Sequence, residues 1–446
     1  MAKQLFTGRT NNSSTDNLFI NPFCYGTWRS TEALSTIHVA AATVFSKLSV
    51  KLASAPGAGT SYTYTLFKNG SATAVTCTIS NTNTSAQDTT NSASFAAGDT
   101  ISIKRTRTGA PAGVIHQISI QAEATSANDS VYGSQADTVG LDSTNTRHAG
   151  VFWSKNDFWA GTATDVQNIV AAAGNITKYY IKFTDNSPGV GKSYTFAIYK
   201  NGVKQDGSGG TVDTRLTVSD TNTTGNVSFT LPVSPGDYVW LEATPSGTPT
   251  SCKTNVGVAF SATTAGQSNI CGFIQSTLST GLTQYFNICG NTAIDSTEAN
   301  VGFIGGQDVF QLSGFQIKLS AAPGLAASGK SYTFDGRLNA ASPTNDLSVQ
   351  ILEVATTGSD TNPAHKVLIS SASDIVNYRS VPANTPTAPG FTWYSAIIGA
   401  PSSGGGAGKG PGGSGKKSGG GGLNKLVPGG ANVYNIGNPG LDIGSA

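Results

Sequence analysis

Histidine and cysteine are the residue types here that most readily hold metals. The chain has four histidines, and none has a second histidine, a cysteine or a carboxylate at the spacing that metal ligands need. They are His38, His116, His148 and His365. The five cysteines form no Cys-x-x-Cys pair. They are Cys24, Cys77, Cys252, Cys271 and Cys289. We therefore expect no metal site and no cofactor, and we expect the cysteines of a chain made in a reducing cytosol to stay as thiols.

Two further patterns could belong to an enzyme. Gly191-Lys192-Ser193 and Gly329-Lys330-Ser331 resemble the end of a phosphate-binding loop, but each precedes a predicted strand, and such a loop needs the N-terminus of a helix. Four carboxylates are candidates for glycoside hydrolysis, yet nothing in the sequence pairs them at a defined separation. They are Asp157, Asp165, Asp185 and Glu242. The sequence therefore predicts no enzymatic activity.

A cluster of aromatic residues is the best candidate for ligand binding. Trp153, Phe158 and Trp159 lie within seven residues, next to Lys155-Asn156-Asp157. If exposed, these rings would form a platform on which a sugar could stack, with polar partners beside it. If buried, they would close one end of a β-sandwich core, and the large area that aromatic residues bury favours this second interpretation.

These residues belong to a chain in which one pattern occurs three times. An apolar-Lys-apolar strand, a Pro-Gly turn and a Tyr-Thr strand follow one another in each copy, as expected for a β-hairpin. The three strands before the turn are Val50-Lys51-Leu52, Ile181-Lys182-Phe183 and Ile317-Lys318-Leu319. The first tyrosines after it, Tyr62, Tyr194 and Tyr332, are 132 and 138 residues apart.

Two shorter motifs follow the hairpin. Lys68-Asn69-Gly70 and Lys200-Asn201-Gly202 predict a type I′ turn, because Asn-Gly accepts positive φ at both central positions. The third copy has Asn339-Ala340, so we expect a longer or different turn there. Further on, an aspartate precedes a strand in every copy, at Asp99, Asp237 and Asp374, and each is expected to cap the backbone of its turn.

Composition and repeat spacing predict an all-β fold. Thr, Val, Ile, Tyr and Phe alternate between Gly, Asn and Pro clusters, which is typical of many short strands. We expect three tandem antiparallel β-sandwich repeats, with jelly-roll and immunoglobulin-like topologies both open, and a Gly-rich C-terminal tail. The predicted boundaries are residues 1–128, 129–266 and 267–400 for the repeats and 401–446 for the tail.

The tail combines two kinds of sequence. Residues 402–422 are almost entirely Gly and Ser, which predicts a flexible linker. Apolar residues return after it, and we interpret them as a peptide that anchors the chain to a neighbouring subunit or to the surface that carries it. These residues are Leu426, Val427, Val433, Tyr434, Ile436, Leu441 and Ile443.

The overall charge argues against several classes of partner. Only 12% of residues are charged and the net charge is +2, which gives no electrostatic case for nucleic acid. The short basic segment Lys104-Arg105-Thr106-Arg107 has no stacking aromatics alongside. No apolar stretch is long enough to span a membrane, and no secretory signal is visible. We expect neither nucleic acid nor a membrane as a partner.

The repeated motifs resemble modules of tailed-bacteriophage virion proteins. The resemblance rests on Pro56-Gly57 to Tyr64, on Lys68-Asn69-Gly70 and on Gly98-Asp99, together with their copies, and it covers about residues 1–400. The third copy departs from it, because it lacks both Asn-Gly and Gly-Asp. The resemblance brings no catalytic residues with it.

The resemblance implies a non-enzymatic structural protein of a virion, of the head-decoration or fibre type, which is assembled in the host cytoplasm. Its expected partners are other virion proteins such as capsid or tail subunits and further copies of itself. A tail, receptor-binding or carbohydrate-binding adhesin is the alternative. In that case a host-surface glycan would contact Trp153, Phe158 and Trp159.

Overall fold

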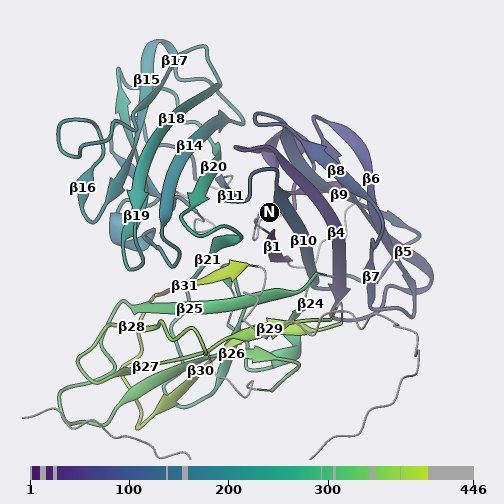
Figure 1. The fold of residues 1–446 in the computed structure, drawn as a ribbon. Helices are drawn as coiled ribbons and strands as arrows, with labels where there is room; N and C mark the ends of the chain where they lie inside the picture. Colours follow the sequence, from purple (N-terminus) through teal and green to yellow (C-terminus); the bar gives the residue numbers. More distant parts are fainter. Residues whose placement is uncertain are drawn as a thin grey trace, which may run out of the picture. The chain divides into compact units, whose positions relative to one another are not determined.

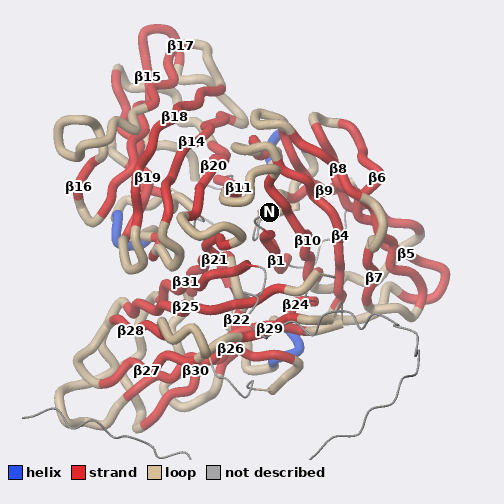
Figure 2. Tube along the Cα trace, viewed as in Figure 1, coloured by secondary structure: helices blue, strands red, loops and turns tan. Residues whose placement is uncertain are grey.

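A computed structural model of the chain describes most of the three repeats. The described residues are 3–10, 17–23, 28–136, 139–152, 159–292, 294–304, 308–341, 347–371 and 373–399. They belong to one compact unit, Met1–Pro401. Strands dominate this part of the chain, and its helices are short 3-10 turns (Figure 2).

Repeat 1 consists of two sheets, whose strands come from residues 3–124 (Figure 1). In the first sheet the order is β1 (Lys3–Thr10), β10 (His116–Ala124), β4 (Thr43–Leu52), with β7 (Ser85–Gln87) and β8 (Ser92–Phe95) both pairing with β4. In the second sheet it is β2 (Leu18–Ile20), β9 (Thr100–Thr108), β5 (Gly57–Lys68), β6 (Ser71–Asn81), with β3 (Ile37–His38) pairing with β9.

Repeat 2 has the same arrangement within residues 129–262. Its first sheet has the order β11 (Asp129–Ala136), β20 (Thr254–Ala262), β14 (Gly174–Phe183), β18 (Thr224–Val233). Its second sheet has the order β12 (Arg147–Ala149), β19 (Tyr238–Ser246), β15 (Gly189–Lys200), β16 (Val203–Lys204), with β13 (Asn168–Ile169) on β19 and β17 (Leu216–Asp220) on β15.

Repeat 3 follows the same pattern within residues 267–399. One sheet has the order β23 (Gly290–Thr292), β21 (Gln267–Ile274), β31 (Thr392–Gly399), β25 (Phe310–Leu319), β28 (Thr357–Asp360), with β29 (Val367–Ile369) on β25. The other has the order β22 (Gln284–Phe286), β30 (Ile375–Ala383), β26 (Ser331–Leu338), β27 (Ser348–Leu352), with β24 (Phe303–Ile304) on β30.

The strand order identifies the topology. If the main strands of repeat 1 are lettered B to I along the chain, its sheets have the orders B-I-D-G and C-H-E-F, and both other repeats give the same two orders. This is the jelly-roll arrangement of eight strands in two Greek keys. The prediction of tandem antiparallel β-sandwiches is confirmed, and the jelly roll is the one of the two predicted topologies that forms. Only β21 and β23, among the described pairs, run parallel.

Alternation of apolar residues places the core between the two sheets. In β5, Tyr62, Tyr64 and Leu66 are buried while Thr63 and Thr65 between them are only partly covered, because successive side chains of a strand point to opposite faces. Tyr194 and Tyr332 take the place of Tyr62 in the other repeats and are equally buried.

The two short motifs of each repeat meet in space. In repeat 1, Asn69 Nδ2 donates to Asp99 Oδ1 at 2.8 Å, the Thr100 amide donates to Asn69 Oδ1 at 2.7 Å, and the Ala96 amide donates to Asp99 Oδ2 at 2.7 Å. The same bonds recur at Asn201 with Asp237 and at Asn339 with Asp374. Each aspartate therefore caps its turn, as predicted.

The turn of repeat 3 differs from its prediction. Leu338 and Ala341 exchange both backbone hydrogen bonds at 3.0 Å, which closes a two-residue turn. Asn339 and Ala340 have φ of 53° and 61° and so take the left-handed geometry that Asn69 and Gly70 adopt in repeat 1. The prediction of a longer or different turn is wrong. The Asn339 side chain donates to Asp374 and accepts from the Ile375 amide, which holds the same turn even though Ala340 has a Cβ.

Candidate functional site

The predicted sugar platform is only partly described. Trp159 is 2% exposed, and its indole Nε1 donates to Thr254 Oγ1 inside the sandwich of repeat 2. Its ring also lies 5.8 Å from that of Phe196, centroid to centroid. The face of Trp159 is therefore not available to a sugar. Trp153 and Phe158 lie outside the described residues.

The predicted anchoring peptide also lies outside the described residues. This applies to Leu426, Val427, Val433, Tyr434, Ile436, Leu441 and Ile443. Its role stays a prediction.

The described candidates for chemistry do not converge. Glu242 is bound to Lys204 Nζ at 2.9 Å, while Asp185 accepts the Lys253 amide at 2.7 Å in a loop. In the described part of the chain, no three His, Cys, Asp or Glu side chains form a group that could hold a metal ion. Burial raises the pKa of the Cys77 and Cys252 thiols to about 12, so neither is a reactive thiolate.

The repeats contact one another through equivalent short strands. The short strand β3 of repeat 1 lies against β11, β14 and β20 of repeat 2. Its counterpart β13 of repeat 2 lies against β21 and β31 of repeat 3, and β24 of repeat 3 lies against β4 and β10 of repeat 1. Each repeat thus uses one short strand to contact the first-named sheet of the next repeat. Repeat 3 contacts repeat 1 in the same way. Such head-to-tail contacts form a closed cycle when the rotation between units closes.

The same lysine serves all three contacts. Lys51, Lys182 and Lys318 are the lysines of the repeated apolar-Lys-apolar strand, and each side chain reaches into the next contact. Lys51 Nζ approaches the Ala299 carbonyl at 3.4 Å, Lys182 Nζ donates to Thr36 Oγ1, and Lys318 Nζ donates to Gln167 Oε1 at 2.8 Å. Burial lowers the pKa of all three lysines. Each ammonium group is therefore partly desolvated and depends on its acceptor.

The contact between repeats 1 and 2 is also fixed by backbone groups. Asn255 Nδ2 donates to the Leu34 carbonyl at 3.1 Å and to the Thr36 carbonyl at 2.8 Å. The His38 ring stacks on Tyr180 with 5.2 Å between centroids. A Cβ on Gly257 would lie 2.0 Å from the His38 carbonyl oxygen, so only glycine permits this approach.

The other two contacts use different side chains. Between repeats 2 and 3, Asn269 Oδ1 accepts the Ala171 and Ala172 amides at 2.8 and 2.7 Å, and Lys318 lies 4.2 Å from the Tyr238 ring centroid. Between repeats 3 and 1, Asp308 binds Lys3 at 3.0 Å and also pairs with Lys47. The three contacts therefore use equivalent strands and an equivalent lysine. Gln117, the counterpart of Asn255, donates to the Ala299 carbonyl at 3.4 Å, so two of the contacts also share a carboxamide donor, while their other side chains differ.

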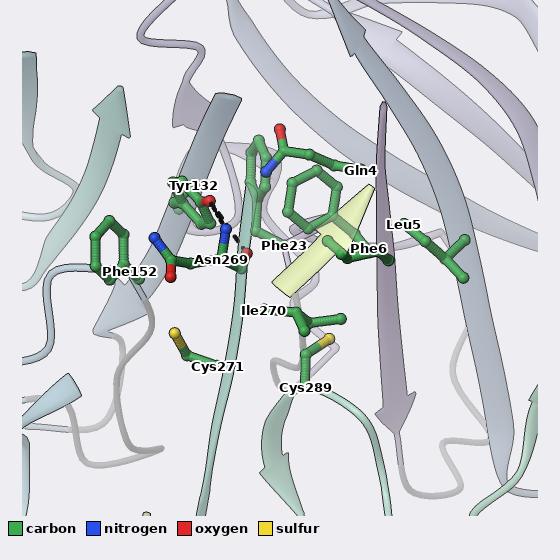
Figure 3. Close-up of a pocket in the computed structure, with 12 residues that line it drawn as sticks. Gln4, Leu5, Phe6, Phe23, Tyr132, Phe152, Asn269, Ile270, Cys271 and Cys289 are labelled. Carbon is green, nitrogen blue, oxygen red and sulfur yellow. Dashed lines mark hydrogen bonds between the residues drawn. The ribbon is translucent and has the colours of Figure 1, made fainter. Parts of the chain in front are cut away.

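A cavity lies where the three repeats meet. It has about 320 Å³ of free space, including its opening to solvent, and residues from all three repeats line it (Figure 3). The first strand of each repeat contributes an apolar residue at the equivalent position, namely Phe6, Tyr132 and Ile270. The Tyr132 hydroxyl donates to the Asn269 carbonyl at 3.1 Å and accepts the Asn269 amide at 2.9 Å (Figure 3).

Cys289 at this cavity corrects the expectation that all cysteines are thiols. Cys289 is disulfide-bonded, whereas Cys77, Cys252 and Cys271 are free and buried. The remaining cysteine, Cys24, lies outside the described residues. Cys289 Sγ is 3.1 Å from Thr7 Oγ1, and because a disulfide sulfur has no proton, the Thr7 hydroxyl must be the donor.

Sequence reasoning missed these contacts, although their signal was present. The apolar-Lys-apolar strand predicts the repeats, and its lysine also indicates a contact between them. A lysine retained at the same point of three strands, while its neighbours vary, indicates a shared contact. The acceptors Thr36 and Ala299 lie just after or within a Ser-Thr-Glu-Ala motif that repeats 1 and 3 share, at residues 30–33 and 296–299. The segment of repeat 2 that holds Gln167 lacks this motif.

Comparison with known proteins does not identify a family for this chain. No family model matches the chain, and no curated protein matches it. Among solved structures, a chain from the atomic structure of Sulfolobus Turreted Icosahedral Virus matches 87% of this chain and 92% of its own length, at 11% sequence identity and a TM-score of 0.16. A TM-score this low carries no argument about fold or function.

Proposed function

We propose that this chain is a non-enzymatic structural protein of a virion, of the capsid-decoration or fibre type. The observation that carries the proposal is the closed cycle of three jelly rolls, in which each repeat presents β3, β13 or β24 to the next. A chain built in this way resembles a trimer joined into one polypeptide. It offers a preformed block for assembly rather than a cleft for catalysis.

Fold and composition support this role by analogy. Jelly rolls are common in viral capsid proteins, and also in lectins, so the fold by itself does not decide the function. The net charge of +2 on 446 residues leaves a nearly neutral block, which can pack against neighbours without strong repulsion. The resemblance of the repeated motifs to modules of tailed-bacteriophage virion proteins supports the same role. The described residues contain no apolar helix of membrane-spanning length.

The tail provides the attachment in this proposal. A Gly/Ser linker over residues 402–422 would let the apolar peptide from Leu426 to Ile443 reach a capsid or tail subunit. Deleting residues 402–446 should leave the jelly rolls folded and abolish attachment to particles. Unchanged attachment of the shortened chain would remove this part of the proposal.

Purified particles test the main proposal. An antibody against the full chain should detect it in particles banded on a density gradient, and immunogold labelling should place it on their surface. A repeating array over the shell would identify a decoration protein, and label on projecting rods would identify a fibre. A chain that stays in the soluble fraction and is absent from purified particles would overturn the proposal.

A further inference from the structure

Two of the three contacts between repeats also have a peptide connection. Residues 125–128 join repeat 1 to repeat 2, between the end of β10 and the start of β11, and residues 263–266 join repeat 2 to repeat 3, between β20 and β21. The contact of repeat 3 with repeat 1 has no such connection, because β31 is followed in the sequence by the C-terminal tail. Only a bond between side chains can therefore join repeat 3 to repeat 1 covalently.

Cys289 of repeat 3 lies at this contact. It is buried, and its Sγ is 3.1 Å from Thr7 Oγ1 on β1 of repeat 1. It is the third residue after β22, and the third residues after β2 and β12 are Phe23 and Phe152. All three residues line the central cavity (Figure 3). Because two of the jelly rolls have phenylalanine at this position, the fold of a repeat does not require a sulfur atom there.

The disulfide of Cys289 has one possible partner in the chain. Three of the five cysteines are free, namely Cys77, Cys252 and Cys271. The fifth is Cys24, which directly follows Phe23 in the sequence. The Phe23 ring lies 4.8 Å from that of Phe6, centroid to centroid, and Phe23 lines the same cavity as Cys289. Consecutive Cα atoms are about 3.8 Å apart and the Cα atoms of a disulfide about 5.5 to 6 Å, so the residue after Phe23 is within reach.

We propose that a disulfide between Cys24 and Cys289, which we call the clasp, closes the cycle of three repeats covalently when the chain reaches an oxidising environment. The clasp forms by thiol–disulfide exchange with a small disulfide oxidant such as glutathione disulfide. One protein thiolate attacks the oxidant and releases a glutathione thiolate. The second protein thiolate attacks this mixed disulfide and releases the other glutathione. The two protein thiols thus lose two electrons and two protons, and the oxidant becomes two glutathione thiols.

The clasp acts on the contact that the chain itself does not connect. In a reducing cytosol the two cysteines stay as thiols, and the contact of repeat 3 with repeat 1 depends on β24 and on the pairs of Asp308 with Lys3 and Lys47. Oxidation closes a loop that runs through all three repeats, and a loop of this length strongly restricts the unfolded chain. The clasp therefore stabilises the closed cycle. It does not depend on the chain being a virion protein.

Mass spectrometry of the full-length chain identifies the pair. The chain is oxidised with glutathione disulfide and then alkylated with iodoacetamide in denaturant without a reductant. Three cysteines should be alkylated, namely Cys77, Cys252 and Cys271, and a protease digest should contain one linked peptide pair, which holds Cys24 and Cys289. After reduction, all five cysteines should be alkylated. Alkylation of all five in the oxidised chain, or a linked pair that holds another cysteine, would overturn the proposal.

Hydrogen exchange tests what the clasp stabilises. Reduction of the folded chain with a small phosphine should speed exchange of the β24 amides by at least about tenfold, because a disulfide typically stabilises by more than this factor. The β3 amides, at the contact between repeats 1 and 2, are the internal control and should be unaffected.

Two variants separate the clasp from other effects of the reductant. Reduction should change nothing in Cys24→Ser, whose β24 amides should already exchange as fast as in the reduced wild-type chain. Reduction should act on Cys77→Ala, which removes a free thiol, as it does on the wild-type chain. Equal exchange of β24 in the oxidised and reduced wild-type chain would overturn the role of the clasp.

Discussion

Repeats 1 and 2 have the same strand order but fill the same core positions with different chemistry. The pairing registers place three residues of repeat 1 opposite their counterparts in repeat 2. Tyr64, Arg105 and His116 correspond to Phe196, Ala243 and Thr254. All six are buried, so the first core holds a guanidinium group where the second holds a methyl group.

The polar core of repeat 1 is an ordered network. Arg105 Nη1 lies 3.0 Å from His116 Nε2, and the guanidinium carbon lies 4.8 Å from the Trp28 ring centroid. His116 Nδ1 lies 2.6 Å from the Tyr64 hydroxyl. Because arginine can only donate, His116 accepts at Nε2 and must carry its proton at Nδ1. The histidine is therefore neutral in the folded protein.

The strand register of a jelly roll therefore fixes where a side chain points but not its chemical type. A buried cation is tolerated where rings and a neutral imidazole surround it. The core of repeat 2 has the same strand order and contains no cation at this position.

Acid should destabilise repeat 1 more than repeat 2. Burial, followed by the charge of Arg105, lowers the pKa of His116 to about 3. The unfolded chain binds a proton near the ordinary value of roughly 6.5, while the folded chain does not. The contribution of neutral His116 to the stability of repeat 1 should therefore be fully present above roughly pH 6.5. The stability should fall by about 1.4 kcal/mol per pH unit from roughly pH 6 to pH 3.

Hydrogen exchange measured strand by strand, and corrected for the intrinsic effect of pH, checks this prediction. Protection of β5, β9 and β10 should decline with acid more steeply than protection of β15, β19 and β20. The turn aspartates Asp99 and Asp237 occur in both repeats, so their titration should cancel in the comparison. Equal pH dependence of the two repeats would contradict it.

Arg105→Ala introduces one residue of the repeat 2 core without the others. It should destabilise repeat 1 by about 3 to 5 kcal/mol, because it leaves a cavity and removes the donor to His116. The triple variant Tyr64→Phe, Arg105→Ala and His116→Thr reproduces the whole set and should be more stable than the single variant. Urea unfolding measures both. A triple variant whose loss equals the sum of its three single losses would refute the equivalence of the two cores.

Gly257→Ser tests whether repeat 2 can accept the residue of its neighbours. Ser119 and Ser395 occupy the equivalent positions of β10 and β31. The new Cβ would strike the His38 carbonyl, so the contact between repeats 1 and 2 should weaken by about 1 to 3 kcal/mol. Faster hydrogen exchange at Ile37 and His38 would report it. Ser119→Gly, the reverse change, should cost about 1 kcal/mol or less. Unaltered exchange in Gly257→Ser would show that the contact is loose.

Ala340→Gly should stabilise repeat 3 by about 1 kcal/mol. Ala340 has φ of 61°, a conformation that costs an L-residue about that much and costs glycine nothing. Gly70→Ala in the equivalent turn of repeat 1 should destabilise by a similar amount. The midpoint of thermal unfolding measures both changes, and a lower midpoint for Ala340→Gly would contradict the assignment of strain to this turn.

Much of the fold could be predicted because its signals are local. The alternation of Tyr62, Tyr64 and Leu66 shows which face is buried, and the aspartate at Asp99 predicts its own cap. The turn at Asn339 could not be predicted from its own residues, since its partner Asp374 is 35 residues away. The candidate binding site at Trp159 could not be predicted in the same way, because the sequence of this aromatic cluster fits both an exposed platform and a buried core.

Residues close together in the sequence are enough to predict that one hairpin pattern occurs three times, that the strands alternate between apolar and polar residues, and that the turns carry caps. Each of these depends on residues within a few positions of one another, where backbone geometry limits the choices. The packing of the folded chain was needed to show that Lys51, Lys182 and Lys318 join the repeats, that the contacts close into a cycle, and that Cys289 forms a disulfide. These depend on which two surfaces meet, and that depends on the shape of both partners together.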